Sequence, residues 1–381
     1  MDLQNQKPIE YIPSGSWIID HLIGDGTMTD KPGGFPRGHM VEIFGDESSG
    51  KTTLALSAIK KVQEMGSFAI LLDFEQTFHA KYAEAVGVDL DKNKLLVMTP
   101  NHFQHGARLI NDAIINMKPP LIVVDSVSAM TPREVIEGDV DEATGVGLQA
   151  RLMSTFLQYI SKFLKDSNTC LMFINQLRSV IKKSKYDPGP DEETSGGRAL
   201  RFYSSVRLKL RKGAVEKINV TSKLTGKKGE EPVNVTIKAT VVKNKIDKPW
   251  RTAPVYIRFG EGFDNIQSIV ELAINIGVIK KEGNSYSFAH KGGVLKVVGK
   301  EQLRKALEEQ DKVFDQLRAN LVIKEDEAVK KEYEAIENED AIDDILNSTA
   351  ESYIDKQKNK KKDASEISDN EEGLENIADK K

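Results

Sequence analysis

One stretch limits the fold of this chain more than any other: an apolar run that breaks into a glycine-bounded loop and then into a helix-forming segment. It spans residues 41–53 and reads VEIFGDESSGKTT. From Gly45 to Thr52 it completes the pattern G-x-x-x-x-G-K-[ST]. The two glycines let the backbone curl so that successive N–H groups point at phosphate oxygens, and the following helix adds its positive dipole end. We therefore predict a strand, a phosphate-binding loop and a helix, since a flexible surface loop would lack these flanking patterns.

The side chains of this stretch indicate which ligand it binds. Lys51 places a positive charge near the β- and γ-phosphates, and the Thr52 hydroxyl is a ligand for Mg²⁺. The predicted nucleotide-binding residues are Gly45, Asp46, Glu47, Ser48, Ser49, Gly50, Lys51, Thr52 and Thr53.

The segments after the loop alternate between helical and strand patterns. Predicted helices cover residues 52–64, 79–86, 104–117 and 147–165, and predicted strands cover 68–73, 95–98, 121–125 and 169–175. Strands separated by helices of 10 to 15 residues imply a parallel sheet with helices on both faces, and the continuous apolar runs fit such burial. The fold class is therefore α/β.

The pattern changes after residue 205. Residues 206–211 and 235–241 alternate apolar and polar, which predicts a hairpin that extends the sheet with antiparallel strands. After residue 262 we expect a small α+β domain. The predicted organisation is a short N-terminal segment (1–36), an ATPase core (37–262), a small C-terminal domain (263–322) and a charged tail (323–381).

Composition limits where the protein is expected to act and which partners it is expected to bind. The 381 residues carry a net charge of −4, but residues 325–344 are rich in Glu and Asp, so the rest is close to neutral with basic clusters. The tail either competes with a polyanion for those clusters or only aids solubility. No run of about 18 apolar residues and no secretory signal is present, so we expect a cytoplasmic protein without a membrane partner. The single cysteine, Cys170, lies in an apolar run and indicates a buried thiol.

Two carboxylates follow predicted strands at the edge where ligands of parallel sheets bind. Asp125 ends strand 121–125 and is our candidate for the Mg²⁺-associated acid, acting through water, with a turn cap as the alternative. Glu75 follows strand 68–73 and could take a proton from an attacking water. A surface turn acid is the alternative for Glu75, and Asp73 is a weaker candidate for the base.

A third strand ends in amides at the same edge. Gln176 can hydrogen-bond a γ-phosphate and report its presence to the segment that follows. That segment is long, polar and basic, and cations interleaved with an aromatic side chain suit single-stranded nucleic acid, although a solvated basic loop explains the pattern equally well. The candidate DNA-binding residues here are Arg178, Lys182, Lys183, Lys185, Tyr186, Gly196 and Gly197.

Taken together, these motifs resemble those of the bacterial RecA recombinase family. The likeness is collinear from about residue 9 to residue 320 and rests on residues 45–53, 86–89, 124–132, 173–178, 196–207 and 241–246. It implies a RecA-like core that binds ATP and Mg²⁺ between neighbouring subunits of a helical filament on single-stranded DNA. Such a filament pairs that strand with a homologous duplex and exchanges strands, so the implied enzyme is a DNA-dependent ATPase.

The resemblance also implies residue roles. Lys51 and Thr52 would hold the phosphates and Mg²⁺, Asp125 the water shell of the metal, and Glu75 would be the general base. Tyr82 matches the tyrosine that stacks on adenine in the family.

Further roles involve the neighbouring subunit and DNA. Gln176 would sense the γ-phosphate, Lys243 and Lys245 would reach the γ-phosphate of the neighbour, and Phe202 would pack across the interface. Two loops would face DNA, which are residues 134–142 with Arg151 after them and residues 177–197.

Three departures from the family pattern accompany this resemblance. The N-terminus is short, Gln76 stands where the family usually has histidine, and the second loop is longer and more basic. Trimmed relatives occur among bacteriophage recombinases, so a phage-type member fits. A hexameric helicase with a similar core, or a non-catalytic nucleotide-regulated DNA-binding protein, are the alternatives, and a single-strand-binding protein or loader is an expected accessory partner. His102 and His105 lack further ligands for a metal and are interpreted as capping or surface residues.

Overall fold

The computed structural model describes residues 8–24, 33–138, 142–179, 192–221 and 228–337. It divides into two compact units, residues 1–316 and 317–381. Within the described part of the chain, no helix is long and apolar enough to cross a membrane.

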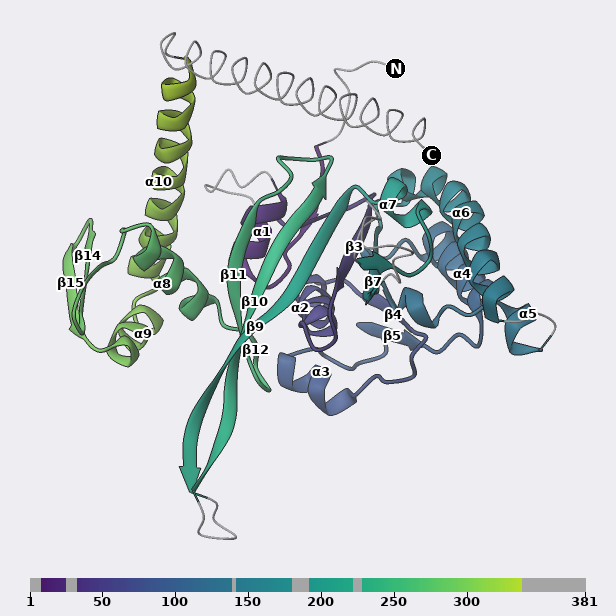
Figure 1. The fold of residues 1–381 in the computed structure, drawn as a ribbon, viewed down its shortest axis with the longest axis horizontal. Coiled ribbons are helices and arrows are strands. Elements are labelled where there is room, and N and C mark those ends of the chain that lie inside the picture. The colour runs from purple at the N-terminus through teal and green to yellow at the C-terminus, as the bar shows by residue number, and fades with distance from the viewer. Residues whose placement is uncertain (1–7, 25–32, 139–141, 180–191, 222–227, 338–381) are drawn as a thin grey trace, which may run out of the picture. The chain divides into compact units, whose positions relative to one another are not determined.

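A ten-stranded sheet forms the centre of the first unit, in the order β12-β11-β10-β9-β3-β7-β6-β4-β5, with β8 paired to β7 (Figure 1). Its parallel part consists of β3 (Met40–Gly45), β4 (Ala69–Asp73), β5 (Leu95–Met98), β6 (Leu121–Asp125), β7 (Cys170–Ser179) and the start of β9 (Val206–Thr221). The antiparallel part consists of β8 (Glu192–Thr194), β10 (Lys228–Asn244), β11 (Thr252–Arg258) and β12 (Gly262–Phe263). The predicted parallel sheet with an antiparallel extension is confirmed.

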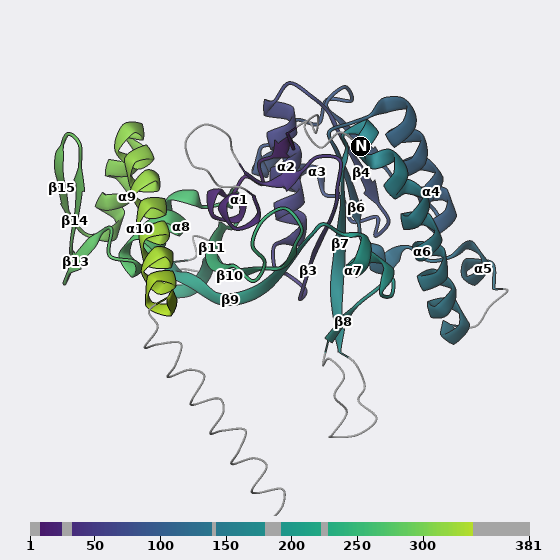
Figure 2. The ribbon, with the colours of Figure 1, turned by 90° about the horizontal axis from the view of Figure 1, so that it is seen from above.

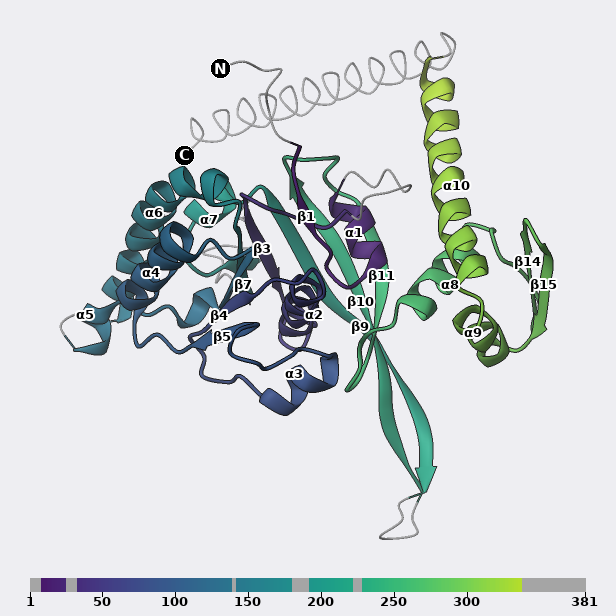
Figure 3. The same cartoon turned by 180° about the vertical axis from the view of Figure 1, so that it is seen from behind.

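Helices cover both faces of the parallel strands (Figures 2 and 3). On one face, α4 (Phe103–Asp112) and α6 (Glu142–Ser167) bury an apolar core against the sheet, while α2 (Lys51–Glu64) contacts β3, β4 and β6. Ile43, Val123 and Ile174 are at most 1% exposed, which is why the strands read as continuous apolar runs. The remaining helices of the core are α3 (Ala80–Val86), the π-helix η2 (Ala113–Met117), the 3₁₀-helix η3 (Val127–Ala129), α5 (Arg133–Ile136) and α7 (Ala199–Tyr203).

The described residues before the phosphate-binding loop form a strand pair and a helix. β1 (Tyr11–Ile12) pairs with β2 (Phe35–Pro36), and α1 (Trp17–Ile23) begins at Ser16, whose hydroxyl accepts from the Ile19 N–H.

The small C-terminal elements comprise a three-stranded sheet and helices. They are α8 (Asn265–Asn275), β13 (Lys280–Glu282), β14 (Ser285–His290), β15 (Gly293–Val298), α9 (Lys300–Glu308) and α10 (Asp311–Glu337).

Two predicted elements differ from the structure for physical reasons. The helix predicted over 104–117 is α-helical only from Phe103 to Asp112, because its last turn, Ala113–Met117, is a π-helix. Lys118 follows this turn as its C-cap and adopts a left-handed φ of 50°. The strand predicted over 169–175 continues to Ser179, because β8 pairs antiparallel with its last three residues. Gln176 therefore lies inside a strand rather than after one.

Candidate nucleotide-binding and catalytic site

The phosphate-binding loop joins β3 to α2, and its two glycines are required by different constraints. A Cβ on Gly45 would lie 1.9 Å from the carbonyl oxygen of Leu210 on β9. Gly50 adopts a φ of 84° at the N-cap of α2, and a Cβ there would meet Ile257 at 2.4 Å. The first glycine permits close strand packing and the second permits the left-handed turn into the helix.

Lys51 lies folded over this loop. The residue is 8% exposed, and its Nζ donates to the carbonyl oxygens of Gly45 at 3.1 Å and Asp46 at 2.5 Å. Burial lowers the pKa of Lys51, while the charges of Asp125 and Asp46 act in the opposite direction. The ammonium group is thus held at the loop, where it can neutralise a phosphate oxygen.

Thr52 and Asp125 supply two oxygen atoms suited to a hard cation. Thr52 Oγ1 donates to Asp125 Oδ2 at 3.0 Å, joining the start of α2 to the end of β6. Burial raises the pKa of Asp125 to about 6, the Thr52 hydrogen bond opposes this, and the charges of Glu75 and Asp73 add to it. A carboxylate crowded by other acids and paired with a hydroxyl fits Mg²⁺, which favours oxygen ligands and keeps several waters.

Glu75 lies between the strands that carry the other candidates. Its Oε1 accepts from Gln176 Nε2 at 3.1 Å and from the Ser126 hydroxyl. Asp73 is 3% exposed and instead accepts from the Phe78 N–H at 2.8 Å, so its side chain shapes the turn after β4. The register of β7 also places Gln176 opposite Gly45 of the phosphate-binding loop. The structure therefore brings Glu75, Gln176, Asp125 and Lys51 to one edge of the sheet.

A cavity of about 240 Å³ opens beside the loop. It is lined by loop residues 48–53, by Tyr82, and by three apolar side chains from the antiparallel strands and the turn after them, which are Val235, Ile257 and Phe259. Thr53 and Tyr82 share a hydrogen bond of 2.6 Å, which fixes the tyrosine ring at the cavity. Sequence reasoning identified Tyr82 but missed the three apolar residues and Ser126.

The candidates for contact with a neighbouring subunit lie apart from this cluster. Lys243 Nζ donates to two carbonyl oxygens at the end of α7, those of Arg201 at 2.5 Å and Phe202 at 3.0 Å. Burial lowers the pKa of Lys243 to about 8, and the positive charges of Lys245 and Arg207 lower it further. Phe202 is 69% exposed and Lys245 is also exposed.

The predicted DNA-binding residues fall into two groups. Arg151 on α6 and Arg178 on β7 are exposed. Gly196 and Gly197 adopt left-handed φ angles of 84° and 74°, and a Cβ on them would meet Val127 at 2.9 Å and Ala150 at 2.8 Å. Lys182, Lys183, Lys185 and Tyr186 lie outside the described residues.

The two candidate histidines and the cysteine have the environments expected of them. His102 is the N-cap of α4, where its ring accepts from the His105 N–H at 3.1 Å. Cys170 is buried, and burial raises the pKa of its thiol to about 12. Among the described residues, no group of three or more metal-ligating side chains is found.

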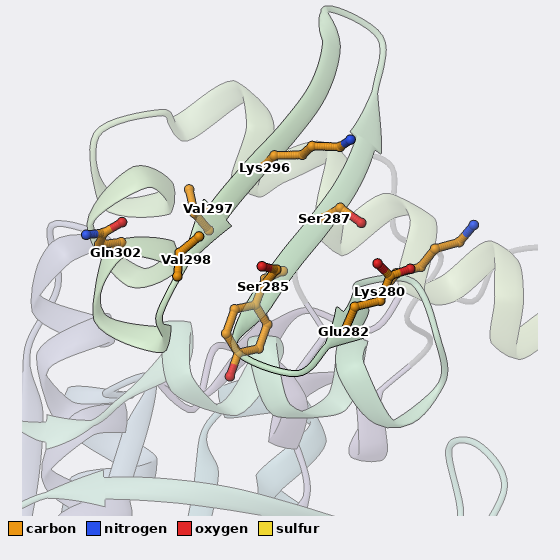
Figure 4. A pocket seen from close by; sticks show the side chains of 9 residues that line it. Lys280, Glu282, Ser285, Ser287, Lys296, Val297, Val298 and Gln302 are labelled. Carbon is orange, nitrogen blue, oxygen red and sulfur yellow. The ribbon is translucent and has the colours of Figure 1, made fainter.

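A second, larger cavity of about 530 Å³ lies on the small C-terminal sheet (Figure 4). Its lining side chains come from all three strands and from Gln302 of α9, and they include Lys280, Glu282 and Lys296. This cavity contains neither a phosphate-binding loop nor the catalytic candidates, so size alone does not identify the site of chemistry.

Comparison with known proteins extends these observations beyond the site. The family described as the RecA N-terminal domain matches residues 1–264, which is more than half of the chain. The chain belongs to the RecA family. It is 40% identical to Protein RecA of Mycoplasma genitalium over 317 residues, covering 83% of this chain and 86% of that protein. It is 40% identical to Protein RecA of Borrelia hermsii over 315 residues (83% and 82%), and 38% identical to that of Thermus thermophilus over 325 residues (85% and 88%).

Membership of the RecA family establishes the general activity. The protein is an ATP-dependent recombinase of DNA recombination and repair that forms filaments on single-stranded DNA and exchanges strands. It is a DNA-dependent ATPase that uses ATP with Mg²⁺. The donor set at Lys51, Thr52 and Asp125 fits both ligands.

Proposed function

We propose that this protein completes its ATPase site only where two subunits meet in the filament. One subunit supplies Lys51, Thr52, Asp125, Glu75 and Gln176, and its neighbour supplies Lys243 and Lys245. Within one chain, the hydrogen bond of 3.1 Å between Glu75 and Gln176 joins the proposed base to the proposed phosphate sensor. The observation that carries this proposal is the exposure of Phe202, at 69%, and of Lys245, which leaves both side chains accessible to another copy.

Each residue of the first subunit then has a role in hydrolysis. The loop N–H groups and Lys51 bind the phosphates, and Glu75 orients a water molecule and accepts its proton. Thr52 and Asp125 would hold Mg²⁺, which would supply positive charge to offset that of the phosphates. Tyr82 stacks on the adenine, opposite the apolar wall of Ile257 and Phe259.

Gln176 links this chemistry to DNA. In the described structure its amide is engaged by Glu75, and a γ-phosphate offers it a second acceptor. We assign the segment that follows it, residues 177–197, and the first loop, residues 134–142 with Arg151, to DNA contact. Cations supply the phosphate contacts, so DNA affinity falls as salt rises.

The regions of the chain divide the work in this proposal. Residues 37–262 form the ATPase core, 1–36 a short N-terminal segment, 263–322 a small C-terminal domain and 323–381 a charged tail. We further propose that the protein acts in the cytoplasm, that of the host if a bacteriophage encodes it. A single-strand-binding protein or a loader would assist it there.

Hydrolysis and assembly can be tested together. We expect ATP turnover to rise on addition of single-stranded DNA, and electron microscopy with ATP and that DNA to reveal open helical filaments. Closed rings would instead favour a hexameric motor with the same core, and turnover indifferent to DNA would contradict the proposal.

A further inference from the structure

A buried polar network joins Glu42 of β3, Asn175 of β7 and Arg207 of β9. None of the roles proposed above uses these three side chains. Glu42, in the middle of β3, is 0% exposed. Its Oε1 accepts from Asn175 Nδ2 at 3.0 Å, and its Oε2 accepts from Arg207 Nε at 2.5 Å. The guanidinium group of Arg207 also lies 4.5 Å from the centre of the Phe44 ring. The position of this buried carboxylate is fixed by the cation and the amide, because moving it would leave a buried charge without partners at a large cost in free energy.

Asn175 connects this fixed point to two other parts of the chain. Its Nδ2 also donates to the carbonyl oxygen of Ser195 at 3.0 Å, and its Oδ1 accepts from the Gln176 N–H at 2.9 Å. The side chain is fully buried. One amide group therefore joins β3, the backbone of the proposed phosphate sensor and the end of the segment assigned to DNA contact.

Ser195 lies where that segment returns to the core. The next two residues, Gly196 and Gly197, leave no room for a Cβ against Val127 and Ala150, so the backbone there is closely packed. The hydroxyls of Thr194 and Ser195 are buried and have no hydrogen-bond partner among the described residues. The bond from Asn175 therefore holds the backbone next to two buried hydroxyls that have no partner among the described residues. A buried hydroxyl without a partner costs free energy, so a second backbone position that pairs these hydroxyls would be stabilised.

We propose that Asn175 is a positioning residue that transmits the state of Gln176 to the C-terminal end of the DNA-contacting segment. The inference rests on the proposed role of Gln176. When Gln176 exchanges Glu75 for a γ-phosphate, its backbone N–H shifts against Asn175 Oδ1. Because Glu42 is held by Arg207, the Asn175 amide turns about that fixed contact and its bond to Ser195 changes.

The test measures the dissociation constant of a fluorescent oligo(dT) in two nucleotide states. The ratio of interest is the constant with ADP divided by the constant with a non-hydrolysable ATP analogue. We expect a large ratio for the wild type and at least a tenfold smaller one for Asn175→Ala. Gln176→Ala should lower the ratio equally, and the double variant should lower it no further, since both residues act in one path. A defect that was only structural would weaken DNA binding in both nucleotide states and leave the ratio unchanged.

Asn234→Ala is the matched control. Asn234 is also a buried strand asparagine, with its amide bonded to Glu216 at 3.2 Å and Gln267 at 3.0 Å, and it lies outside the network. We expect this variant to keep the wild-type ratio. An equal loss of the ratio in Asn234→Ala and Asn175→Ala would overturn the specific role of Asn175.

A second variant keeps the test informative if Asn175→Ala does not fold. In Asn175→Asp combined with Glu42→Gln, the amide at position 42 donates to the carboxylate at position 175, so the contact between strands is restored. The carboxylate cannot donate to Ser195, however, and we expect the ratio to stay small. A wild-type ratio in either variant would overturn the role of Asn175 and leave the proposed function standing. A ratio near one in the wild-type protein would instead overturn the proposed function, because DNA binding would then not depend on the nucleotide.

Discussion

The two proposed halves of the ATPase site differ in how their polar side chains are satisfied. At the edge of the parallel strands, Thr52 is bonded to Asp125 and Gln176 to Glu75, so these side chains hold one another in place before a ligand binds. On the antiparallel side, Lys243 donates to the backbone carbonyl oxygens of Arg201 and Phe202 in α7, and Phe202 is 69% exposed. We infer that folding prepares the first half, whereas assembly prepares the second.

The largest effect is expected from the prepared half. Lys51→Ala removes the ammonium group at the phosphates, so we expect both ATP binding and hydrolysis to be lost, with kcat/KM down by about a thousandfold or more. Steady-state ATPase assays with single-stranded DNA, together with nucleotide-binding titration, measure this. Lys81→Ala, an exposed lysine on α3, is the control and should resemble the wild type. Full turnover by Lys51→Ala would contradict the role of Lys51 and of the half of the site to which it belongs.

Glu75→Ala separates binding from chemistry within the same half. Because the carboxylate is proposed to accept a proton only during hydrolysis, we expect ATP binding to persist while kcat falls by about a hundredfold to ten-thousandfold. Filaments should then persist on DNA with ATP, as seen by electron microscopy. Glu84→Ala, at an exposed position on α3, provides the control, and normal turnover by Glu75→Ala would exclude Glu75 as the base.

Neither half by itself accounts for DNA binding, which we assign to the basic segment. Replacing Lys182, Lys183 and Lys185 together with Ala should weaken binding and reduce the slope of log affinity against log salt by about 2. Fluorescence anisotropy across a salt series measures that slope. The matched control replaces Lys81, Lys92 and Lys162, which are exposed elsewhere. A slope equal to that of the wild type in the first variant would contradict the segment assignment.

The smallest effect on activity is expected outside both halves, at Asp20 in α1. Burial raises the pKa of Asp20 from 3.8 to about 7 in the folded protein. The folded state therefore keeps a proton that the unfolded state has lost, so the free energy of unfolding falls as pH rises from 3.8 to about 7. At about 1.4 kcal/mol per pKa unit, the fall amounts to a few kcal/mol.

Asp20→Asn should flatten this pH dependence without changing ATP turnover. Urea unfolding at pH values on either side of that window provides the measurement. Asp112→Asn, at an exposed position on α4, should leave the dependence intact. A dependence that survives in Asp20→Asn would assign it to other groups.

Much of the fold could be predicted because it depends on local patterns. The fixed spacing from Gly45 to Thr52 and the fully buried runs of β4 and β6 identify a parallel sheet whatever the rest of the chain does. Features created by distant pairing were missed. The extension of β7 to Ser179 needs a partner strand, Glu192–Thr194, that is not apparent until the chain has folded back.

The site shows the same division. Lys51 and Asp125 follow from motifs at strand ends, but the apolar wall of the cavity comes from Ile257 and Phe259, roughly two hundred residues along the chain from the loop. Nor does any sequence spacing reveal that Glu75 accepts a hydrogen bond from Gln176. Local patterns predict the residues that we propose to bind the phosphates, whereas the register of the sheet decides which side chains surround them.

The most direct test of the account mixes two defective proteins. Neither Glu75→Ala nor Lys243→Ala alone should hydrolyse ATP, since each breaks every interface of its own filament. In a random mixture, about one interface in four joins an intact Glu75 to an intact Lys243 from its neighbour, because the contact between subunits is head-to-tail. The account predicts that mixing restores DNA-stimulated ATP turnover to about a quarter of the wild-type rate. A mixture as inactive as its two components would show that the site does not draw on two subunits.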